Sequence, residues 1–211
     1  MPPDPAPPDG SPALRIVPAN EAAWEDIQTV LGTRGTGVIC QCQRFKLAPR
    51  ESFRSFPLEE RAARFRVQAN FDHPAATTTS GLLAYLDDEP MGWCAVEPRS
   101  SYRGLLRVYR VPWLGRSEDK NDDTVWAITC FFIRAGYRHR GFVYQLAGAA
   151  AEFARERGAR AVEGYPMVTQ SGEEVIWDEI FVGTRTVFEA AGFSEVSRPT
   201  PRRAVMRIDF R

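Results

Sequence analysis

The residues best placed to do chemistry form a short basic loop, which consists of Arg134, Arg138, His139, Arg140 and Gly141. A glycine at the start of a helix lets an anion approach the unpaired backbone N–H groups of the first turn, where the helix dipole is positive. Arginine side chains add charge-assisted donors for phosphate oxygens. The loop therefore suits a diphosphate ligand. The alternative interpretation is a plain connection whose arginines only keep it soluble.

Two elements must position this loop. Residues 126–133 are apolar or neutral throughout, which indicates a strand buried on both faces. The segment that follows the loop has apolar residues at helical spacing, namely Phe142, Leu146, Ala149, Ala150 and Phe153. Gly158 is placed to end that helix. The pattern predicts a buried strand that leads through the basic loop into an amphipathic helix.

The segment Tyr-Arg-His-Arg-Gly-Phe-Val resembles the Arg/Gln-x-x-Gly-x-Gly/Ala signature of the GNAT superfamily of acyl-CoA-dependent N-acyltransferases. The matching positions are Arg138, Gly141 and Val143, and Val143 departs from the usual Gly or Ala. The turn at 190–193, Ala-Ala-Gly-Phe, resembles the helix-to-strand turn that closes the family's domain. The resemblance covers residues 82–208 and, more weakly, 14–31.

The resemblance implies one α/β (α+β) domain over residues 13–211. Its sheet is expected to be mixed and largely antiparallel, with helices on both faces and a V-shaped opening beside the central strand. In the family, the loop binds the pyrophosphate of acetyl-CoA, the preceding strand binds the pantetheine arm, and a backbone N–H near Phe132 or Ile133 serves as oxyanion donor. The implied cofactor-binding residues are Phe131, Phe132, Ile133, Arg138, His139, Arg140, Gly141, Phe142, Val143 and Tyr144.

The general acid is not evident, because Phe188 stands where many relatives have a tyrosine. Glu163 and Tyr165 follow the cofactor helix in a predicted strand, and their i, i+2 spacing puts both side chains on one face. We predict them as catalytic base and acid, given suitable pKa shifts. The alternative is that Glu163 pairs with an arginine and Tyr165 packs under the following loop.

The predicted activity is N-acetyl transfer from acetyl-CoA to an amine of a small molecule or peptide, directly within a ternary complex. By the family's arrangement, residues 32–57 line the acceptor side. An alternative, suggested by Phe188 and Val143, is a non-catalytic acyl-CoA-binding regulatory module; a third is transfer of a longer acyl group. Cys40 and Cys42 have neither a nearby histidine nor a second cysteine pair, so no metal site is predicted.

The composition limits the binding partners and the cellular location that the sequence predicts. Basic and acidic residues number 27 each, so no global field favours nucleic acid or an anionic membrane. No apolar run approaches the roughly 18 residues of a membrane span, and no secretory signal is recognised. Four cysteines without a disulfide pattern favour a cytoplasmic location. Residues 1–12 hold six of the 16 prolines and are expected to be a disordered tail. Many relatives pair through their C-terminal strands, so a homodimer is one expectation.

Local patterns predict the remaining elements. Asn20 is the expected N-cap of a helix that ends at Gly32, and in a second helix Arg61, Arg64 and Arg66 are expected on the outer face. The predicted helices are 21–31, 58–71 and 183–191, and the predicted strands are 14–17, 81–86, 91–96, 161–165, 193–196 and 205–210. Residues 98–123 are expected to be an irregular, partly helical excursion, and 168–180 an exposed loop.

Overall fold

The computed structural model describes residues 13–53, 55–107, 109–169 and 177–211, so the predicted tail and most of the predicted loop at 168–180 lie outside the described residues. The strands are β1 (Leu14–Pro18), β2 (Gly81–Leu86), β3 (Glu89–Pro98), β4 (Val125–Ile133), β5 (Ala161–Gly164), β6 (Ser194–Thr200) and β7 (Arg203–Asp209). The α-helices are α1 (Trp24–Leu31), α2 (Thr36–Cys40), α3 (Leu58–Ala69), α4 (Arg103–Arg107), α5 (Phe142–Glu156) and α6 (Arg185–Ala190). Short 3-10 turns are η1 (Ala19–Glu21), η2 (Arg99–Ser101), η3 (Val111–Trp113), η4 (Ala135–Tyr137) and η5 (Trp177–Val182).

All seven strands form one sheet in the order β1-β2-β3-β4-β5-β7-β6. Neighbouring strands are antiparallel except β4 and β5, which are parallel and are connected through α5. The β4–β5 ladder covers four residue pairs and ends at Ile128 and Gly164. Because β4 continues to Ile133, its second half has no β5 partner. The sheet therefore opens beside the central strand, as expected from the sequence.

A β-bulge lies in β4 at the start of this opening. Ala95 of β3 is opposite Cys130, whereas the next residue, Val96, is opposite Ile128, so Thr129 is the extra residue. A bulge bends its strand and increases the local twist. The bulge thus bends β4 at the point where its pairing with β5 stops.

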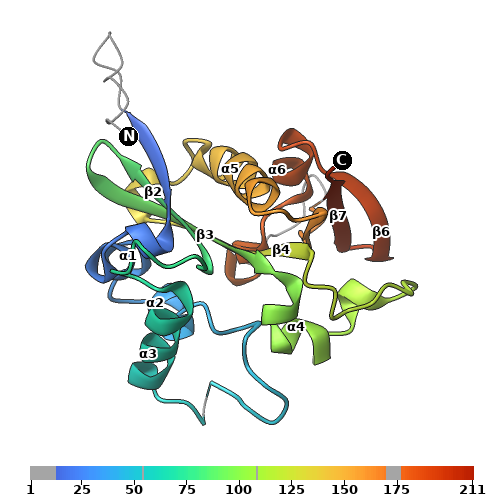
Figure 1. The fold of residues 1–211 in the computed structure, drawn as a ribbon, viewed down its shortest axis with the longest axis horizontal. Coiled ribbons are helices and arrows are strands. Elements are labelled where there is room, and N and C mark those ends of the chain that lie inside the picture. The colour runs from blue at the N-terminus through green and yellow to red at the C-terminus, as the bar shows by residue number, and fades with distance from the viewer. Residues whose placement is uncertain (1–12, 54, 108, 170–176) are drawn as a thin grey trace.

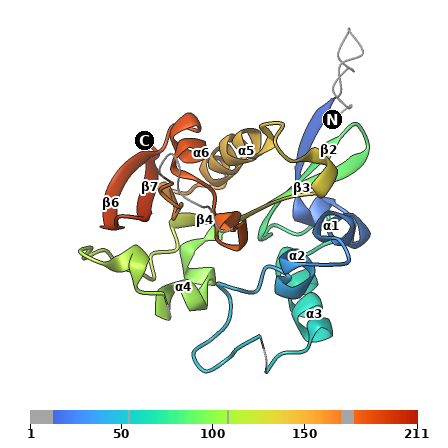
Figure 2. The ribbon, with the colours of Figure 1, turned by 180° about the vertical axis from the view of Figure 1, so that it is seen from behind.

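Helices cover both faces of the sheet (Figures 1 and 2). On one face α5 and α6 pack on the largest apolar cluster, which includes Leu146, Ala150 and Phe188. On the other face α1 and α3 surround Trp93, and a third cluster under α4 includes Leu105. These residues are buried, so their transfer from water supplies most of the driving force for this arrangement.

Helix α6 packs closely against the end of the β4–β5 ladder. The Phe188 ring lies directly over Gly164, and a Cβ atom at Gly164 would come within 2.1 Å of it. Phe188 also contacts Phe131 and Phe193 at ring-centroid distances of 5.8 Å and 5.0 Å. Gly164 therefore permits α6 to approach the sheet where β5 ends.

Three local predictions were wrong. Asn20 does not cap α1; its buried amide donates to the carbonyl oxygens of Pro74 and Ala76 at 3.4 Å and 3.2 Å, and Ala23 occupies the N-cap position. Arg61 is buried, because its guanidinium donates to the carbonyl oxygens of Phe53 and Phe56, both at 2.7 Å. The short helix α2 was not expected within the segment 32–57.

Candidate active site

The basic loop has the backbone geometry of an anion site. Gly141 is the N-cap of α5 with φ +81°, a left-handed conformation that glycine adopts without steric cost. His139 also has positive φ, at +62°. The N–H groups of Phe142 and Val143 lie at the positive end of this 15-residue helix, before the first bond of the turn, in which the Tyr144 N–H donates to the Gly141 carbonyl at 3.0 Å. These features fit a diphosphate, which takes backbone donors at such a helix start.

The free edge of β4 offers a second set of backbone donors. The Arg134 N–H donates to the carbonyl of Met91 in β3 at 2.9 Å, so residue 134 faces β3. Alternate residues of a strand direct their N–H and C=O groups to opposite edges. The N–H groups of Phe131 and Ile133 therefore face the opening, beyond the last β4–β5 pair. Of the two positions predicted for the oxyanion donor, this geometry selects Ile133 over Phe132.

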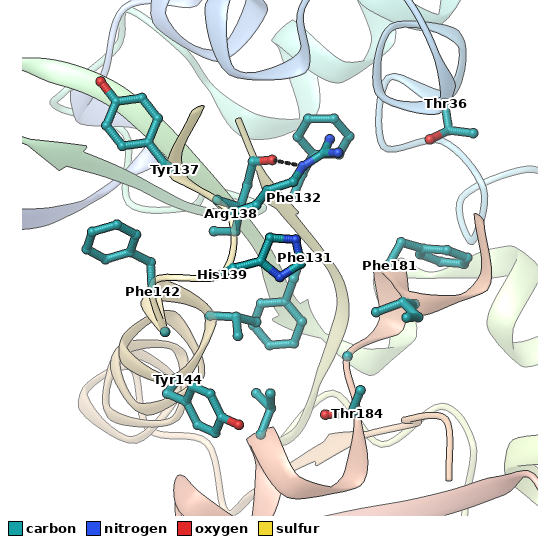
Figure 3. Close-up of a pocket in the computed structure, with 16 residues that line it drawn as sticks. Thr36, Phe131, Phe132, Tyr137, Arg138, His139, Phe142, Tyr144, Phe181 and Thr184 are labelled. Atoms are coloured by element: carbon teal, nitrogen blue, oxygen red, sulfur yellow. Dashed lines mark hydrogen bonds between the residues drawn. The ribbon is translucent and has the colours of Figure 1, made fainter. Parts of the chain in front are cut away.

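A cavity of about 530 Å³ joins the loop to this strand edge. Figure 3 shows the loop and α5 on one side, and Phe181 and Thr184 on the other. The lining residues are Thr36, Phe131, Phe132, Ile133, Tyr137, Arg138, His139, Gly141, Phe142, Val143, Tyr144, Ile180, Phe181, Gly183, Thr184 and Val187. Nine of the ten predicted cofactor-binding residues are in this set; Arg140 is not. Their role in binding stays a prediction.

Arg138 reaches from the loop across the mouth of this cavity. Its Nε donates to the Ile133 carbonyl oxygen at 3.0 Å, which Figure 3 shows as a dashed line, and its guanidinium carbon is 5.9 Å from the centroid of the Phe132 ring. Arg140 instead lies near the Tyr137 ring, at 5.7 Å. Arg138 is thus the arginine that the structure places against the cavity.

Val143 does not close the cavity. Its side chain is half-buried and packs against the apolar cluster under α5, while the residue still lines the cavity. The departure from the usual Gly or Ala is accommodated within the first helical turn, so the loop keeps its N-terminal N–H groups.

Sequence reasoning missed most of the wall opposite α5. Thr36 comes from α2, within the segment 32–57 that was expected on the acceptor side, whereas Ile180, Phe181 and Thr184 come from η5 and the start of α6. The Tyr144 and Thr184 side chains lie on opposite sides of the cavity (Figure 3). No local pattern marks these residues, because their proximity depends on how η5 packs against β4. The proline at 166, which ends the preceding strand, was the only nearby signal.

Glu163 and Tyr165 lie outside the cavity lining. Glu163 is fully buried, and its carboxylate contacts three arginines: Arg99 at 3.3 Å, Arg207 at 2.7 Å, and Arg116. The Tyr165 hydroxyl donates to Glu163 Oε2 at 3.0 Å. This arrangement agrees with the alternative in which Glu163 pairs with arginine. The catalytic assignment of the two residues stays a prediction that their position does not favour.

The ionisation of this cluster also differs from that of an acid–base pair. Burial by itself would raise the pKa of Glu163, but Arg116, Arg99 and Arg207 outweigh it and lower the pKa. Burial, and then the Glu163 charge, raise the pKa of the Tyr165 hydroxyl well above its usual value. Glu163 is therefore a fixed carboxylate and Tyr165 a neutral phenol at neutral pH, which suits an ion cluster that holds β5 to β7.

Phe188, which stands at the usual position of the family's acid, is fully buried between Phe131 and Phe193. Its neighbour Val187, rather than Phe188, lines the cavity. Among the described residues, no group of three or more His, Cys, Asp or Glu side chains is arranged to hold a metal ion. Within the same residues, no helix has the length and apolar character needed to cross a membrane.

Comparisons with known proteins agree with this geometry. The structure of YncA from Salmonella typhimurium with its cofactor acetyl-CoA is 12% identical, with a TM-score of 0.52 over 93% of this chain and 94% of that chain. An N-acetyltransferase from Staphylococcus aureus Mu50 is also 12% identical, with a TM-score of 0.52 over 93% and 98% of the two chains. These likenesses show the fold. No curated protein matches the sequence.

The mixed, mostly antiparallel sheet with flanking helices is the GNAT fold. The sequence model of the acetyltransferase (GNAT) family matches residues 45–168, which is more than half of the chain. The chain therefore belongs to the GNAT acetyltransferase family, and its enzyme class is acyltransferase.

Proposed function

We propose that the protein transfers an acetyl group from acetyl-CoA to a primary amine, directly and with both substrates bound. The observation that carries the proposal is the cavity that links the N-terminus of α5 to the free edge of β4. One end offers donors for a diphosphate, and the other offers backbone donors for a carbonyl oxygen. Acetyl-CoA carries these two groups at opposite ends of its pantetheine arm.

Each end of the cavity has a distinct task. At the loop, the amides that follow Gly141 and the side chain of Arg138 bind phosphate oxygens. At the strand, the Ile133 N–H is available to donate to the thioester carbonyl oxygen, where negative charge develops during attack. Acetyl-CoA supplies the activated acetyl group. The protein thus binds, orients and polarises it through backbone groups that need no particular side chain.

The acceptor amine must reach this carbonyl without its proton. Among the described residues, no aspartate or glutamate lines the cavity, so the structure offers no carboxylate base there. We infer that the amine enters in its neutral form and that His139, the imidazole in the lining, is not needed as a base. The rate should therefore rise with pH until the amine itself is deprotonated, and Glu163→Gln should leave the shape of this profile unchanged.

The test is release of free CoA thiol from acetyl-CoA in the presence of an amine panel, measured from pH 6 to 10. Amine-dependent thiol release that rises with pH supports the proposal. Binding of acetyl-CoA without thiol release for any amine would instead favour the acyl-CoA-binding regulatory module. Faster release from a bulkier acyl-CoA than from acetyl-CoA would assign a longer acyl donor.

A further inference from the structure

A second, smaller cavity of about 50 Å³ adjoins the first one on the face that carries α1 and α2. Its lining residues are Leu31, Thr36, Gly37, Cys40, Cys42, Arg44, Cys130, Phe132 and Phe181. Thr36, Phe132 and Phe181 line both cavities, so their side chains form the boundary between them. A small molecule held in the second cavity would therefore lie next to the free half of β4, where the acetyl group is expected.

Arg44 is the only basic residue among the described residues that line this smaller cavity. Its guanidinium carbon lies 4.8 Å from the centroid of the Phe181 ring, so it stacks on an aromatic face. Within the described part of the chain, no carboxylate forms an ion pair with it. By contrast, the next basic residue, Lys46, is paired with Glu97. Among the described residues, Arg44 thus brings to the cavity wall a positive charge that no carboxylate pairs with.

The other lining groups are apolar residues, three thiols and the hydroxyl of Thr36, none of which is basic. Burial raises the pKa of the Cys40 thiol, and a hydrogen bond with Cys42, followed by burial, raises that of Cys130, so both stay neutral. The same hydrogen bond lowers the pKa of Cys42, whose sulfur also accepts from the Trp93 indole N–H at 2.9 Å. The cavity wall therefore offers one strong recognition group for an anion, the guanidinium of Arg44.

The backbone that presents Arg44 is held from several sides. Gln41 and Cys42 both have left-handed φ values, +43° and +49°, which is a costly conformation for non-glycine residues. The Gln41 side chain exchanges two amide hydrogen bonds with Gln28 at 3.1 Å, and Gln43 donates to Gln68 at 2.9 Å. Such a fixed turn orients Arg44 before a ligand arrives, which reduces the entropy lost on binding.

From this arrangement we infer that the acceptor is a small primary amine that also carries a carboxylate, as an amino acid does, with the carboxylate bound by Arg44. A planar guanidinium donates two parallel hydrogen bonds to a carboxylate, which fixes the direction of the rest of the molecule. With the carboxylate at Arg44, the amine points past Phe132 and Phe181 toward the larger cavity. This inference rests on the proposed acetyl transfer and names its acceptor class.

The test uses matched acceptors that differ in one group. Thiol release from acetyl-CoA is measured with L-alanine and L-alaninamide, with β-alanine and propylamine, and with phosphoethanolamine as the phosphate counterpart. The expected result is a kcat/KM, expressed per neutral amine, that is at least about 10-fold higher for L-alanine than for L-alaninamide and for β-alanine than for propylamine, because the amide and the alkylamine lose a charge-assisted hydrogen bond. Arg44→Ala should remove this preference, and Arg44→Lys should restore part of it.

Arg103→Ala is the control, because Arg103 is an exposed arginine that lines neither cavity. It should keep the preference for carboxylates. A thermal shift with acetyl-CoA on every variant reports folding and the donor site separately. Three results would show that the inference is wrong, provided that acetyl-CoA stabilises the wild-type protein. They are equal reaction of acid and amide, no reaction of any carboxylate acceptor, and a preference for phosphoethanolamine. If acetyl-CoA fails to stabilise the wild-type protein, the proposed function itself is overturned, and this inference with it.

Discussion

Glu163→Gln tests whether Glu163 anchors the fold rather than the chemistry. The substitution keeps the size of the side chain but removes the charge that Arg99, Arg116 and Arg207 surround. Removing one partner of a buried ion pair lowers the free energy of unfolding by about 3–5 kcal/mol. Glu118 also contacts these arginines, at 3.2, 3.0 and 3.1 Å, and still neutralises part of their charge. We therefore expect a loss near the lower end, about 3 kcal/mol at pH 7.

The effect should depend on pH in one direction. The arginines lower the folded-state pKa of Glu163 below its value in the unfolded chain, so its contribution is fully present above the unfolded pKa of about 4.3. It is lost as the pH falls through the lower, folded-state pKa. The difference in unfolding free energy between wild type and Glu163→Gln should thus be constant near neutrality and shrink in acid.

Urea unfolding at a series of pH values measures this difference, with unchanged m-values as the check on two-state behaviour. Glu195→Gln is the control, because Glu195 pairs with Arg198 at 2.6 Å at the surface and should contribute less than about 1 kcal/mol. Equal stability of wild type and Glu163→Gln at pH 7 would refute the anchoring role. A Glu163→Gln protein that is stable but loses the pH dependence of thiol release would restore the catalytic assignment.

Two pairs of glycine substitutions give further predictions. Gly164→Ala should destabilise the protein by about 1–3 kcal/mol or more, because its Cβ would meet the Phe188 ring at 2.1 Å. Gly148→Ala in α5 is the control: its Cβ would meet nothing within 4 Å, so the substitution should be neutral or stabilising. Thermal unfolding compares the two variants. Gly141→Ala, at φ +81°, should weaken acetyl-CoA binding. Gly158→Ala, at φ +79° beyond the other end of α5, should lower stability by a similar amount but leave binding intact. Calorimetric titration measures binding by both variants, and equal binding would contradict the role of the loop.

The central part of the fold could be predicted from the sequence, because its signals are local. The unbroken apolar run predicted the bounds of β4 to within one residue. The helical spacing and Gly158 predicted where α5 begins and approximately where it ends. The nine strand, loop and helix residues at the larger cavity were implied by the family resemblance of the same stretch. Here, local pattern and tertiary structure point to the same answer.

The errors occur where distant segments decide the outcome. Arg61 has the sequence context of a solvent-facing residue, but its guanidinium donates hydrogen bonds to carbonyl groups of the preceding loop. The helix α2 is five residues long and contains glycine and β-branched residues, so propensity alone did not indicate it. Glu163 was chosen for its spacing from Tyr165, whereas its burial depends on arginines 64, 47 and 44 positions away.

The most direct test of acetyl-CoA binding at the α5 loop is a thermal-shift titration with acetyl-CoA on the wild type, on Arg138→Ala/Arg140→Ala, and on a control with two other exposed arginines replaced, Arg155→Ala/Arg198→Ala. A ligand that binds only the folded state raises the melting temperature as its concentration increases. We predict that the wild type and the control shift alike and that the loop variant loses most of the shift. No shift in the wild type, or an equal shift in all three proteins, would contradict the proposed binding site.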